Sequence, residues 1–361
     1  MLVSEVPALR EYWYPVALSS EVNSDPLGFR IFGENHVLWR GGDGSLHAAA
    51  DECPHRGGRL SQGWLEDGCL VCPYHGWRFD SSGACVEIPQ KDPALPIPPR
   101  ARVPSVLVEE RYGLAWVCVG MPRAAVPELP ECEDPAWTLI HEIFDVWSTS
   151  APRLIDNALD VSHLSFVHKG TIGDPAHPRL SDFGVERDGT SLRFTVSYTS
   201  RVNELQRQNV GLTGTHTTRT THAELVQPLV FRGVLEYENG IKHILFRVGT
   251  PVDDTHTIVC QFVARNDDPT PERQETIAEL DRAVQNEDRR ILEAINPNFP
   301  IDLTTEFHTR ADRMTVEFRR ILGDLAKETS LVRPDREWAR QLEQRGNGRE
   351  SFIGLEDRSA G

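Results

Sequence analysis

The sequence predicts an α+β chain of two domains, and three observations support this fold class. The 361 residues exceed the size of most single domains, and a composition of 39% hydrophobic and 25% charged residues is that of a globular protein. Residues from about 10 to 120 contain short apolar runs separated by turn residues, which is typical of β-structure. Longer strand patterns and a long helical pattern follow, so the two parts of the chain differ in architecture.

The first domain is expected to span residues 1–125 and to consist of strands joined by turns. The stretches "HVLWRGGDGSLHAA" (36–49) and "WRFDSSGACVEI" (77–88) each have the pattern strand, Gly-containing turn, strand. The stretch "YGLAWVCVG" (112–120) is mostly apolar, which indicates a buried strand. The segment 122–135 is rich in Pro and acidic residues, a composition typical of a linker.

The second domain is expected to span residues 126–340 and to combine helices with long strands. A helix is predicted near 151–165, where Pro152 suits the first turn. The strand patterns after it are "SLRFTVSYTS", "ELVQPLVFRGVLEY", "KHILFRVGT" and "TIVCQFVARN". A long helix is predicted from about Pro271 to Ile295, stopped by Pro297. Residues 341–361 are polar and are expected to form a flexible tail.

Charge and composition exclude several classes of partner. The net charge of −16 argues against nucleic acid, whose phosphates require a basic surface. The sequence has no run of about 18 apolar residues, so no transmembrane helix is expected. The N-terminus has neither a basic stretch nor a long apolar core, and we expect no signal peptide. The seven cysteines, an odd number, favour a reducing cytoplasm over a disulfide framework.

Two short turns in the first domain each carry one cysteine and one histidine. The turn "CPHRGGRL" holds Cys53 and His55, and "CPYHGW" holds Cys72 and His75. The proline in each turn stiffens the loop, and the glycine allows a close approach of the backbone. Paired turns of this kind predict a metal clamp built from two loops.

Three interpretations of this clamp compete. The residues could be scattered on ordinary turns, or they could form a structural zinc site with two Cys and two His. They could also hold a [2Fe–2S] cluster with two cysteines on one iron and two histidines on the other. Because each loop offers one residue of each kind, a bridged cluster that both loops reach at both irons fits the pattern best. Tyr74 and Trp77 would then either shield the cluster or simply pack in the core.

A second set of polar residues lies in "DNALDVSHLSFVHKG" (156–170), within an otherwise apolar helical pattern. A continuous helix would place Asp156, Asp160 and His163 on one face, with His168 off that face unless the helix ends or bends. Two neutral histidines and one carboxylate form the facial triad that suits non-haem Fe(II). The alternative is a solvated helix face with incidental histidines, which the apolar surroundings disfavour.

The long helix offers a distant carboxylate. Asp288 lies between Val284 and Ile291 in an apolar stripe that also contains Ile277, Leu280 and Ile295. A lone carboxylate in such a stripe carries a high desolvation cost unless it binds something. Glu287 and Asp281 lie off the stripe and are weaker candidates. Asp288 could instead sit at the edge of the stripe and reach solvent.

Both motifs together resemble those of the Rieske-type non-haem iron oxygenases. "CPHRG" with "CPYHGW" resembles the Rieske cluster motif, and Asp160, His163 and His168 match the family's Asp-x-x-His-x4-His signature. The resemblance covers roughly residues 10–325. It implies a Rieske [2Fe–2S] β domain followed by a catalytic domain of the helix-grip kind, with an antiparallel sheet and flanking helices.

The resemblance also implies roles for individual residues. His163, His168 and Asp288 would bind the mononuclear Fe(II). Asp160 would lie between a Rieske histidine and an iron-bound histidine, and Asn157 would sit near the iron. Electrons from NAD(P)H would arrive through an external ferredoxin or flavin reductase, because no such segment is present in the chain. A head-to-tail homotrimer would bring each cluster to the iron of the next subunit.

The implied reaction is O₂-dependent hydroxylation or oxidative demethylation of an aromatic or otherwise apolar small molecule, as in the vanillate and dicamba monooxygenase branch. Ring cis-dihydroxylation is the alternative within the family. A Rieske electron carrier would need only the first motif, and a zinc-stabilised binding protein would need no iron. His216, His222, His243, His256 and His308 show no ligand spacing and are expected to be ordinary, although the polar stretch "GTHTTRTTH" could reach a substrate cavity.

Overall fold

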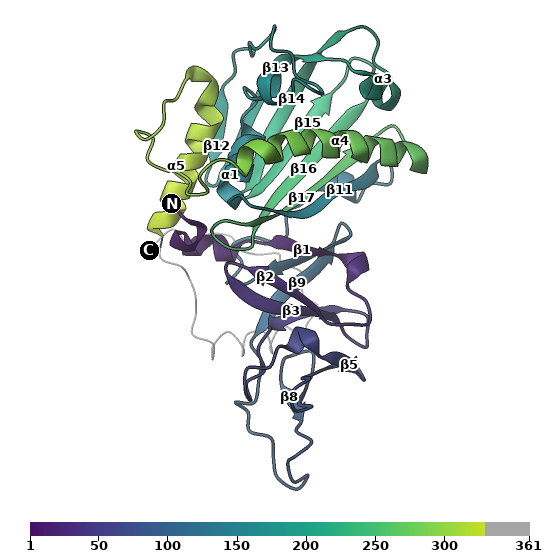
Figure 1. Cartoon of the computed structure of the whole chain (residues 1–361), viewed down its shortest axis with the longest axis vertical. Coiled ribbons are helices and arrows are strands. Elements are labelled where there is room, and N and C mark those ends of the chain that lie inside the picture. Colours follow the sequence, from purple (N-terminus) through teal and green to yellow (C-terminus); the bar gives the residue numbers. More distant parts are fainter. Residues whose placement is uncertain (329–361) are drawn as a thin grey trace, which may run out of the picture.

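The computed structural model describes residues 1–328, so the expected tail at 341–361 lies outside the described residues. Within them, the paired strands form three sheets, and every pairing is antiparallel. Figure 1 shows the seven-stranded sheet and the helices at one end of the molecule and the small β5–β8 sheet at the other. The predicted α+β fold class is confirmed.

The N-terminal domain contains a six-stranded and a four-stranded sheet. The larger has the order β1 (Tyr14–Leu18), β10 (Leu114–Cys118), β9 (Ser105–Arg111), β4 (Leu46–Ala50), β3 (Glu34–Arg40), β2 (Leu27–Ile31). The smaller has the order β5 (Trp64–Glu66), β6 (Cys69–Val71), β7 (Arg78–Phe79), β8 (Cys85–Glu87). The two predicted hairpins are therefore β3–β4 and β7–β8. The predicted buried strand is β10, in which every residue is buried.

The C-terminal domain is a seven-stranded sheet covered by helices. Its order is β11 (Thr138–Trp147), β17 (Thr257–Arg265), β16 (Lys242–Pro251), β15 (Val230–Glu236), β14 (His216–Gln227), β13 (Ser191–Arg201), β12 (Val185–Asp188). The helices are α1 (Ala151–Leu159), α2 (Leu164–Val167), α3 (Glu204–Val210), α4 (Pro271–Leu292) and α5 (Arg313–Lys327). Figure 1 shows α4 lying across the strands of this sheet, which is the expected helix-grip arrangement. Short 3₁₀ helices are η1 (Val3–Glu5), η2 (Pro7–Glu11), η3 (Ser19–Glu21), η4 (Leu60–Gln62), η5 (Pro130–Cys132) and η6 (Arg310–Asp312).

Two predicted elements differ from the structure. The stretch 224–237 forms two strands, because Pro228 has no N–H for the ladder and the chain turns between Gln227 and Val230. The helix predicted near 151–165 ends at Leu159, where Asp160 adopts an extended conformation with φ −81° and ψ 111°. The Asp160 carboxylate accepts the Ser162 N–H at 2.7 Å, and this local turn competes with the helical hydrogen bonds.

The segment 122–135, expected to be a linker, packs against the first domain. Val126 and Leu129 are buried, and the Leu129 N–H donates to the Tyr112 hydroxyl at 2.8 Å. The same hydroxyl donates to the Pro127 carbonyl at 3.0 Å. One hydrophobic cluster also includes residues of both halves of the chain. The two halves are therefore joined by a continuous core, and the segment between them is held in place.

Candidate metal centres

The two Cys–His loops have closely similar backbones. In each, the glycine four residues after the cysteine donates its N–H to the cysteine carbonyl at 2.9 Å, Gly57 to Cys53 and Gly76 to Cys72. Both glycines have positive φ, +70° and +71°, which a side chain would strain. The sequence repeats Cys-Pro and Gly in both turns because both turns make the same bend.

The four side chains of these loops face one another in the first domain. The rings of His55 and His75 lie 4.4 Å apart between centroids, and Trp77 stacks on His55 at 4.6 Å. The thiols of Cys53 and Cys72 are buried, and burial raises the pKa of Cys53. The Nδ1 atom of His55 is buried without a hydrogen-bond partner. A buried pair of thiols beside an unpartnered imidazole nitrogen is a donor set that a metal group would complete.

The geometry of this set favours a two-iron cluster over a single zinc ion. A tetrahedral ion needs its ligand atoms within a few Å of one another. Among the residues that the structure describes, no three of Cys53, His55, Cys72 and His75 bring their ligand atoms within 4.8 Å of one another. A cluster with two irons requires no such common point, because each iron takes only one pair of ligands.

The second set converges closely. The Nε2 atoms of His163 and His168 are 3.2 Å apart, and Asp288 Oδ1 lies 3.3 Å from each. An ion about 2.1 Å from each atom would see any two of them at roughly 100°, a common coordination angle. Asp288 is 2% exposed, so it does not reach solvent at the edge of the stripe. The chain break at Asp160 makes the convergence possible, because His163 and His168 flank the short helix α2.

The electrostatics of the three residues favour a bound cation. Burial lowers the pKa of His163, but the nearby Asp160 and Asp288 carboxylates outweigh burial and raise it to about 9. Burial raises the pKa of Asp288, but contacts with both histidines outweigh it and hold the pKa well below its ordinary value. Asp288 is therefore a buried carboxylate that stays ionised. Without an ion, a proton on His163 balances its charge, and a divalent ion bound by the three atoms would take the place of that proton.

Each histidine has a carboxylate at its other nitrogen. Asp160 Oδ2 lies 3.5 Å from His163 Nδ1, and Glu287 Oε2 lies 3.0 Å from His168 Nδ1. Such partners fix the tautomer and the ring orientation of metal-binding histidines. The sequence indicates Glu287 only as a weaker ligand candidate than Asp288, and no signal in it points to a contact with His168.

Asn157 and Asp156, neighbours in the sequence, have different surroundings. The amide of Asn157 donates to Asp288 Oδ1 at 3.2 Å and accepts from Arg247 at 3.2 Å. Asp156 faces away from this set and pairs with Arg319 Nη1 at 2.5 Å. The single helix face expected for Asp156, Asp160 and His163 is therefore wrong, because the helix ends before Asp160.

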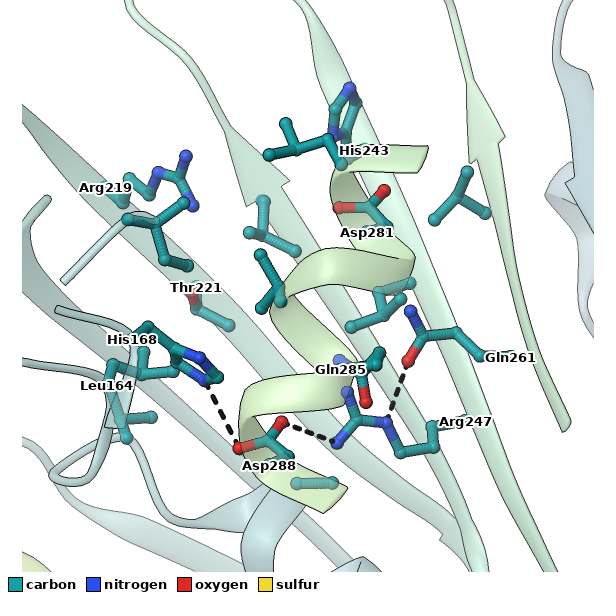
Figure 2. Close-up of a pocket in the computed structure, with 18 of the residues that line it drawn as sticks. Leu164, His168, Arg219, Thr221, His243, Arg247, Gln261, Asp281, Gln285 and Asp288 are labelled. Atoms are coloured by element: carbon teal, nitrogen blue, oxygen red, sulfur yellow. Dashed lines mark hydrogen bonds and ion pairs between the residues drawn. The ribbon is translucent and has the colours of Figure 1, made fainter. Parts of the chain in front are cut away.

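A pocket extends from the His–His–Asp triangle between α4 and the sheet. Figure 2 shows His168 and Asp288 at one end of this pocket and Arg219 and His243 at the other. Its walls include apolar side chains from both layers, among them Leu235, Leu245, Val263, Ile277, Leu280 and Val284. The polar stretch around Arg219 and Thr221 reaches the pocket, as the sequence allowed.

Several polar residues of the pocket were missed in the sequence. Arg247 donates to Gln261 at 2.9 Å, and Gln261 donates to Glu142 at 2.9 Å. Burial and then the neighbouring Asp281 carboxyl raise the pKa of Glu142 well above its ordinary value. These residues alternate with apolar ones along the strands, and the alternation alone does not show which face lines a cavity.

Two histidines treated as ordinary have notable surroundings. His243 lines the pocket and is buried. His216 Nε2 lies 3.0 Å from Asp174 Oδ2, and His177 Nδ1 lies 2.5 Å from the same oxygen. The three form a second compact His–His–Asp group, with both histidines exposed. Asp174 also lies near Arg201, so the group is accounted for by ion pairs within the protein.

Family models match both parts of the chain. The Rieske [2Fe-2S] domain matches residues 12–106, and the vanillate O-demethylase oxygenase C-terminal domain matches residues 147–328. The chain belongs to the Rieske-type non-haem iron oxygenases. It is the oxygenase component of such a system, carries a [2Fe–2S] cluster and Fe(II), and depends on a separate reductase or ferredoxin for electrons.

Individual relatives agree with this family. The methylxanthine N1-demethylase NdmA of Pseudomonas putida is 29% identical over 326 residues, covering 88% of this chain and 89% of NdmA. The dicamba O-demethylase oxygenase component of Stenotrophomonas maltophilia is 36% identical over 185 residues, covering 50% and 54%. The solved structure of NdmA superposes with a TM-score of 0.77 at 27% identity, covering 90% of this oxygenase and 92% of NdmA. Among the described residues, the oxygenase has no helix long and apolar enough to cross a membrane.

Proposed function

We propose that this oxygenase hydroxylates or oxidatively demethylates a small, largely apolar molecule in the pocket beside His163, His168 and Asp288. The observation that carries the proposal is the triangle of their ligand atoms, 3.2–3.3 Å apart, at one end of a pocket with apolar walls. These three residues would hold Fe(II), which supplies O₂ activation when bound. Cys53, His55, Cys72 and His75 would hold the [2Fe–2S] cluster.

The remaining residues would position the ligands and the substrate. Asp160 would orient His163, and Glu287 would orient His168, each through the Nδ1 atom of the histidine. Asn157 ties Asp288 to Arg247, which fixes the carboxylate in the triangle. The apolar wall excludes water from the end of the pocket where the reaction takes place. We assign electron entry to residues 1–125 and catalysis to residues 126–340.

Electron transfer would occur between subunits of a homotrimer. Figure 1 places the sheet that precedes the Cys72 loop at the opposite end of the chain from the catalytic sheet. His55, His75 and Asp160 are each partly exposed, so the two ends of the path can meet across an interface. We further propose that the enzyme is cytoplasmic, because none of its seven cysteines, all within the described residues, forms a disulfide. Its electrons would come from NAD(P)H through a ferredoxin or flavin reductase.

The proposal is tested by the metal content and the spectrum of the purified protein. We expect a red-brown protein with Rieske-type absorption and about three irons per chain, two in the cluster and one mononuclear. A colourless protein with stoichiometric zinc would contradict it. A protein with the cluster alone, and no mononuclear iron after anaerobic loading, would instead indicate an electron carrier.

Ring cis-dihydroxylation is the second candidate. A relative supports it, the 3-chlorobenzoate-3,4-dioxygenase oxygenase subunit of Comamonas testosteroni, 29% identical over 270 residues, covering 70% of this chain and 58% of the relative. Turnover under ¹⁸O₂ separates the two candidates. A hydroxylated product carries one labelled oxygen and a cis-diol carries two. Oxidative demethylation instead releases the labelled oxygen in formaldehyde and leaves none in the demethylated product.

A further inference from the structure

We infer that the end of the pocket remote from Asp288 is an anion subsite centred on Arg219, and that the substrate is a small apolar molecule carrying one carboxylate group. The inference rests on the proposed function, because it assumes that this pocket receives the substrate. The carboxylate would bind at the Arg219 end, and the apolar body would extend toward the proposed iron ligands (Figure 2).

The strand places Arg219 inside the pocket. The buried residues of β14 alternate from Thr217 through Arg219 and Thr221, so all three point to the same face of the sheet. Arg219 is 5% exposed and lines the pocket. This end is separated from the proposed iron site. His243 lies at the Arg219 end and Arg247 lies near Asp288, and the two are four residues apart on β16, about 13 Å along an extended strand.

Arg219 has no carboxylate partner among the described residues. Its guanidinium lies over the Tyr237 ring at 5.3 Å and contacts Tyr198, and its Nε is buried without a hydrogen-bond partner. Asp281 also lines the pocket, but it adjoins Glu142 and is not within ion-pair distance of Arg219. Burial lowers the pKa of Arg219, but Tyr237, Tyr198 and the more distant Asp281 carboxylate together raise it more, so the side chain remains a cation. A buried cation without a counter-ion is costly, which indicates that an anion from outside the chain completes it.

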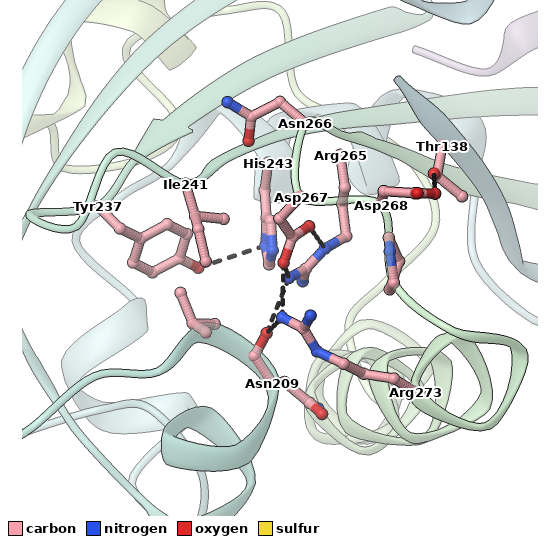
Figure 3. A network of polar contacts seen from close by, with 12 residues as sticks. Thr138, Asn209, Tyr237, Ile241, His243, Arg265, Asn266, Asp267, Asp268 and Arg273 are labelled. Atoms are coloured by element: carbon pink, nitrogen blue, oxygen red, sulfur yellow. Dashed lines mark hydrogen bonds and ion pairs between the residues drawn. The ribbon is translucent and has the colours of Figure 1, made fainter. Parts of the chain in front are cut away.

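The neighbours of Arg219 add positive charge and free hydrogen-bonding atoms. Figure 3 shows Arg265 and Arg273 sharing one carboxylate, that of Asp267, with distances of 2.7 and 2.5 Å from their Nη2 atoms. Arg265 lines the pocket, is 0% exposed, and leaves its Nη1 without a partner. His243 beside it also leaves its Nε2 unpartnered. Three cations (Arg219, Arg265 and Arg273) against two carboxylates (Asp267 and Asp281) leave one excess positive charge at this end of the pocket.

These features select the class of ligand. A planar guanidinium recognises a carboxylate through two parallel hydrogen bonds, and His243 and Arg265 leave further atoms that could bind its oxygens. The pocket between this end and Asp288 has apolar walls, which suit an aromatic or aliphatic body. A sulfonate shares the charge but not the planar shape, so it should bind more weakly than the matching carboxylate.

The test measures binding, without turnover, to the iron-loaded holoprotein under anaerobic conditions. Isothermal titration calorimetry compares benzoate, 4-methoxybenzoate, phenylacetate and cinnamate, each with its neutral amide and with benzenesulfonate as the sulfonate probe. At least one carboxylate should bind about 10- to 100-fold more tightly than its amide, the range expected for a hydrogen-bonded charge pair. If no carboxylate is preferred over its amide, the inference is overturned.

Variants locate the preference. Arg219→Met should reduce the acid-over-amide preference at least about 10-fold, and Arg219→Lys should retain part of it. The matched control is Arg193→Met, which removes an exposed arginine that pairs with Glu224 on the neighbouring strand. It should leave the preference unchanged. A preference that persists in Arg219→Met would mean that the iron or another group binds the acid, and would overturn the role of Arg219.

A second measurement guards against a purely structural role. Without ligand, Arg219→Met should unfold at a temperature no lower than the parent, because it removes an unpaired buried charge. A clearly lower unfolding temperature would show that the contacts of Arg219 with Tyr198 and Tyr237 stabilise the fold, and would contradict the inference. If the parent protein binds no mononuclear iron, the proposed function is contradicted. The inference about acid binding is not, because calorimetry measures acid binding separately.

Discussion

Asp288 and Glu287 are adjacent in the sequence but act on different atoms. One residue of α-helix corresponds to a rotation of about 100°, so neighbouring side chains leave α4 in different directions. Asp288 reaches the Nε2 atoms of both histidines, whereas Glu287 reaches Nδ1 of His168 and the Thr171 hydroxyl, which donates to it at 2.7 Å. Asp288 is therefore placed where a ligand of the proposed iron would lie, and Glu287 where it would orient the ligand His168.

We predict that Asp288→Ala loses the mononuclear iron and turnover while it keeps the Rieske spectrum. The change removes one of three ligand atoms and leaves the Cys–His loops untouched. Iron content, visible absorption and O₂ uptake with substrate are the measurements. The control is Glu279→Ala, an exposed carboxylate on the same helix, which should keep all three properties. If Asp288→Ala retains iron while Asp281→Ala or Glu287→Ala loses it, the ligand is misassigned.

Glu142 provides a prediction about pH. Its pKa is raised in the folded protein, chiefly by burial, whereas an unfolded glutamate titrates near about 4.3. Folding therefore takes up a proton above that pH, and the free energy of unfolding falls as pH rises toward the folded pKa. Glu142→Gln removes this dependence while keeping the hydrogen bond from Gln261.

We expect the unfolding temperature of Glu142→Gln, relative to the parent, to rise between pH 5 and pH 8. Scanning fluorimetry of the two holoproteins at several pH values measures the difference. Glu279→Gln, on the exposed face of α4, should show a difference that is constant with pH. A constant difference for Glu142→Gln as well would mean that Glu142 ionises at an ordinary pH in the folded protein.

At the scale of elements, the break after α1 creates the site. A helix continued through Asp160 would place His163 and His168 on different faces, so their side chains could not converge. The turn closed by Asp160 and Ser162 frees the chain, so that His163 and His168 point to one place from the two ends of α2. Asp160 has two functions here, because Oδ1 closes the turn while Oδ2 faces His163 Nδ1.

We predict that Asp160→Asn keeps both metals but loses most activity. An asparagine oxygen can still accept the Ser162 N–H, so the turn and the iron ligands remain in place. The negative charge at His163 Nδ1 is lost, which alters how the ligand is oriented and how electrons reach the iron. The test is single-turnover oxidation of the reduced cluster with substrate and O₂. A normal oxidation rate would show that Asp160 has no role in electron transfer.

Local patterns predicted the elements better than their ends and contacts. The Cys–His spacing, the apolar stripe around Asp288 and the strand alternation follow from short-range geometry and appear in the sequence. The end of α1 depended on one side chain, Asp160, competing with backbone hydrogen bonds, and the turn at Pro228 was read as continuous strand. The roles of Glu287 and Arg219 depend on contacts with residues far along the chain, and a single sequence does not show such contacts.

At the scale of the whole molecule, the position of the two proposed centres favours electron transfer between subunits. The small β5–β8 sheet, next to which the Cys–His loops lie in the sequence, is at one end of the chain, and helix α4, which carries Asp288, is at the other (Figure 1). The shared core fixes the two halves relative to each other, so a hinge motion is not expected to bring them together. The proposed head-to-tail ring would solve this problem, because a heterologous contact repeated around an axis would join each cluster to the next iron.

Complementation between two inactive variants tests the ring. A Cys72→Ala chain should bind mononuclear iron but no cluster, and a His163→Ala chain should carry a cluster but no working iron. Each alone should be inactive. In mixed trimers formed from equal amounts, about a quarter of the interfaces would join an intact cluster to an intact iron, so about a quarter of the parent activity should return. Differential tags verify the mixing, and metal analysis verifies the content of each chain.

If mixed oligomers form with both metals present and activity stays at zero, transfer runs within one chain. The partial exposure of His55, His75 and Asp160 would then need another explanation.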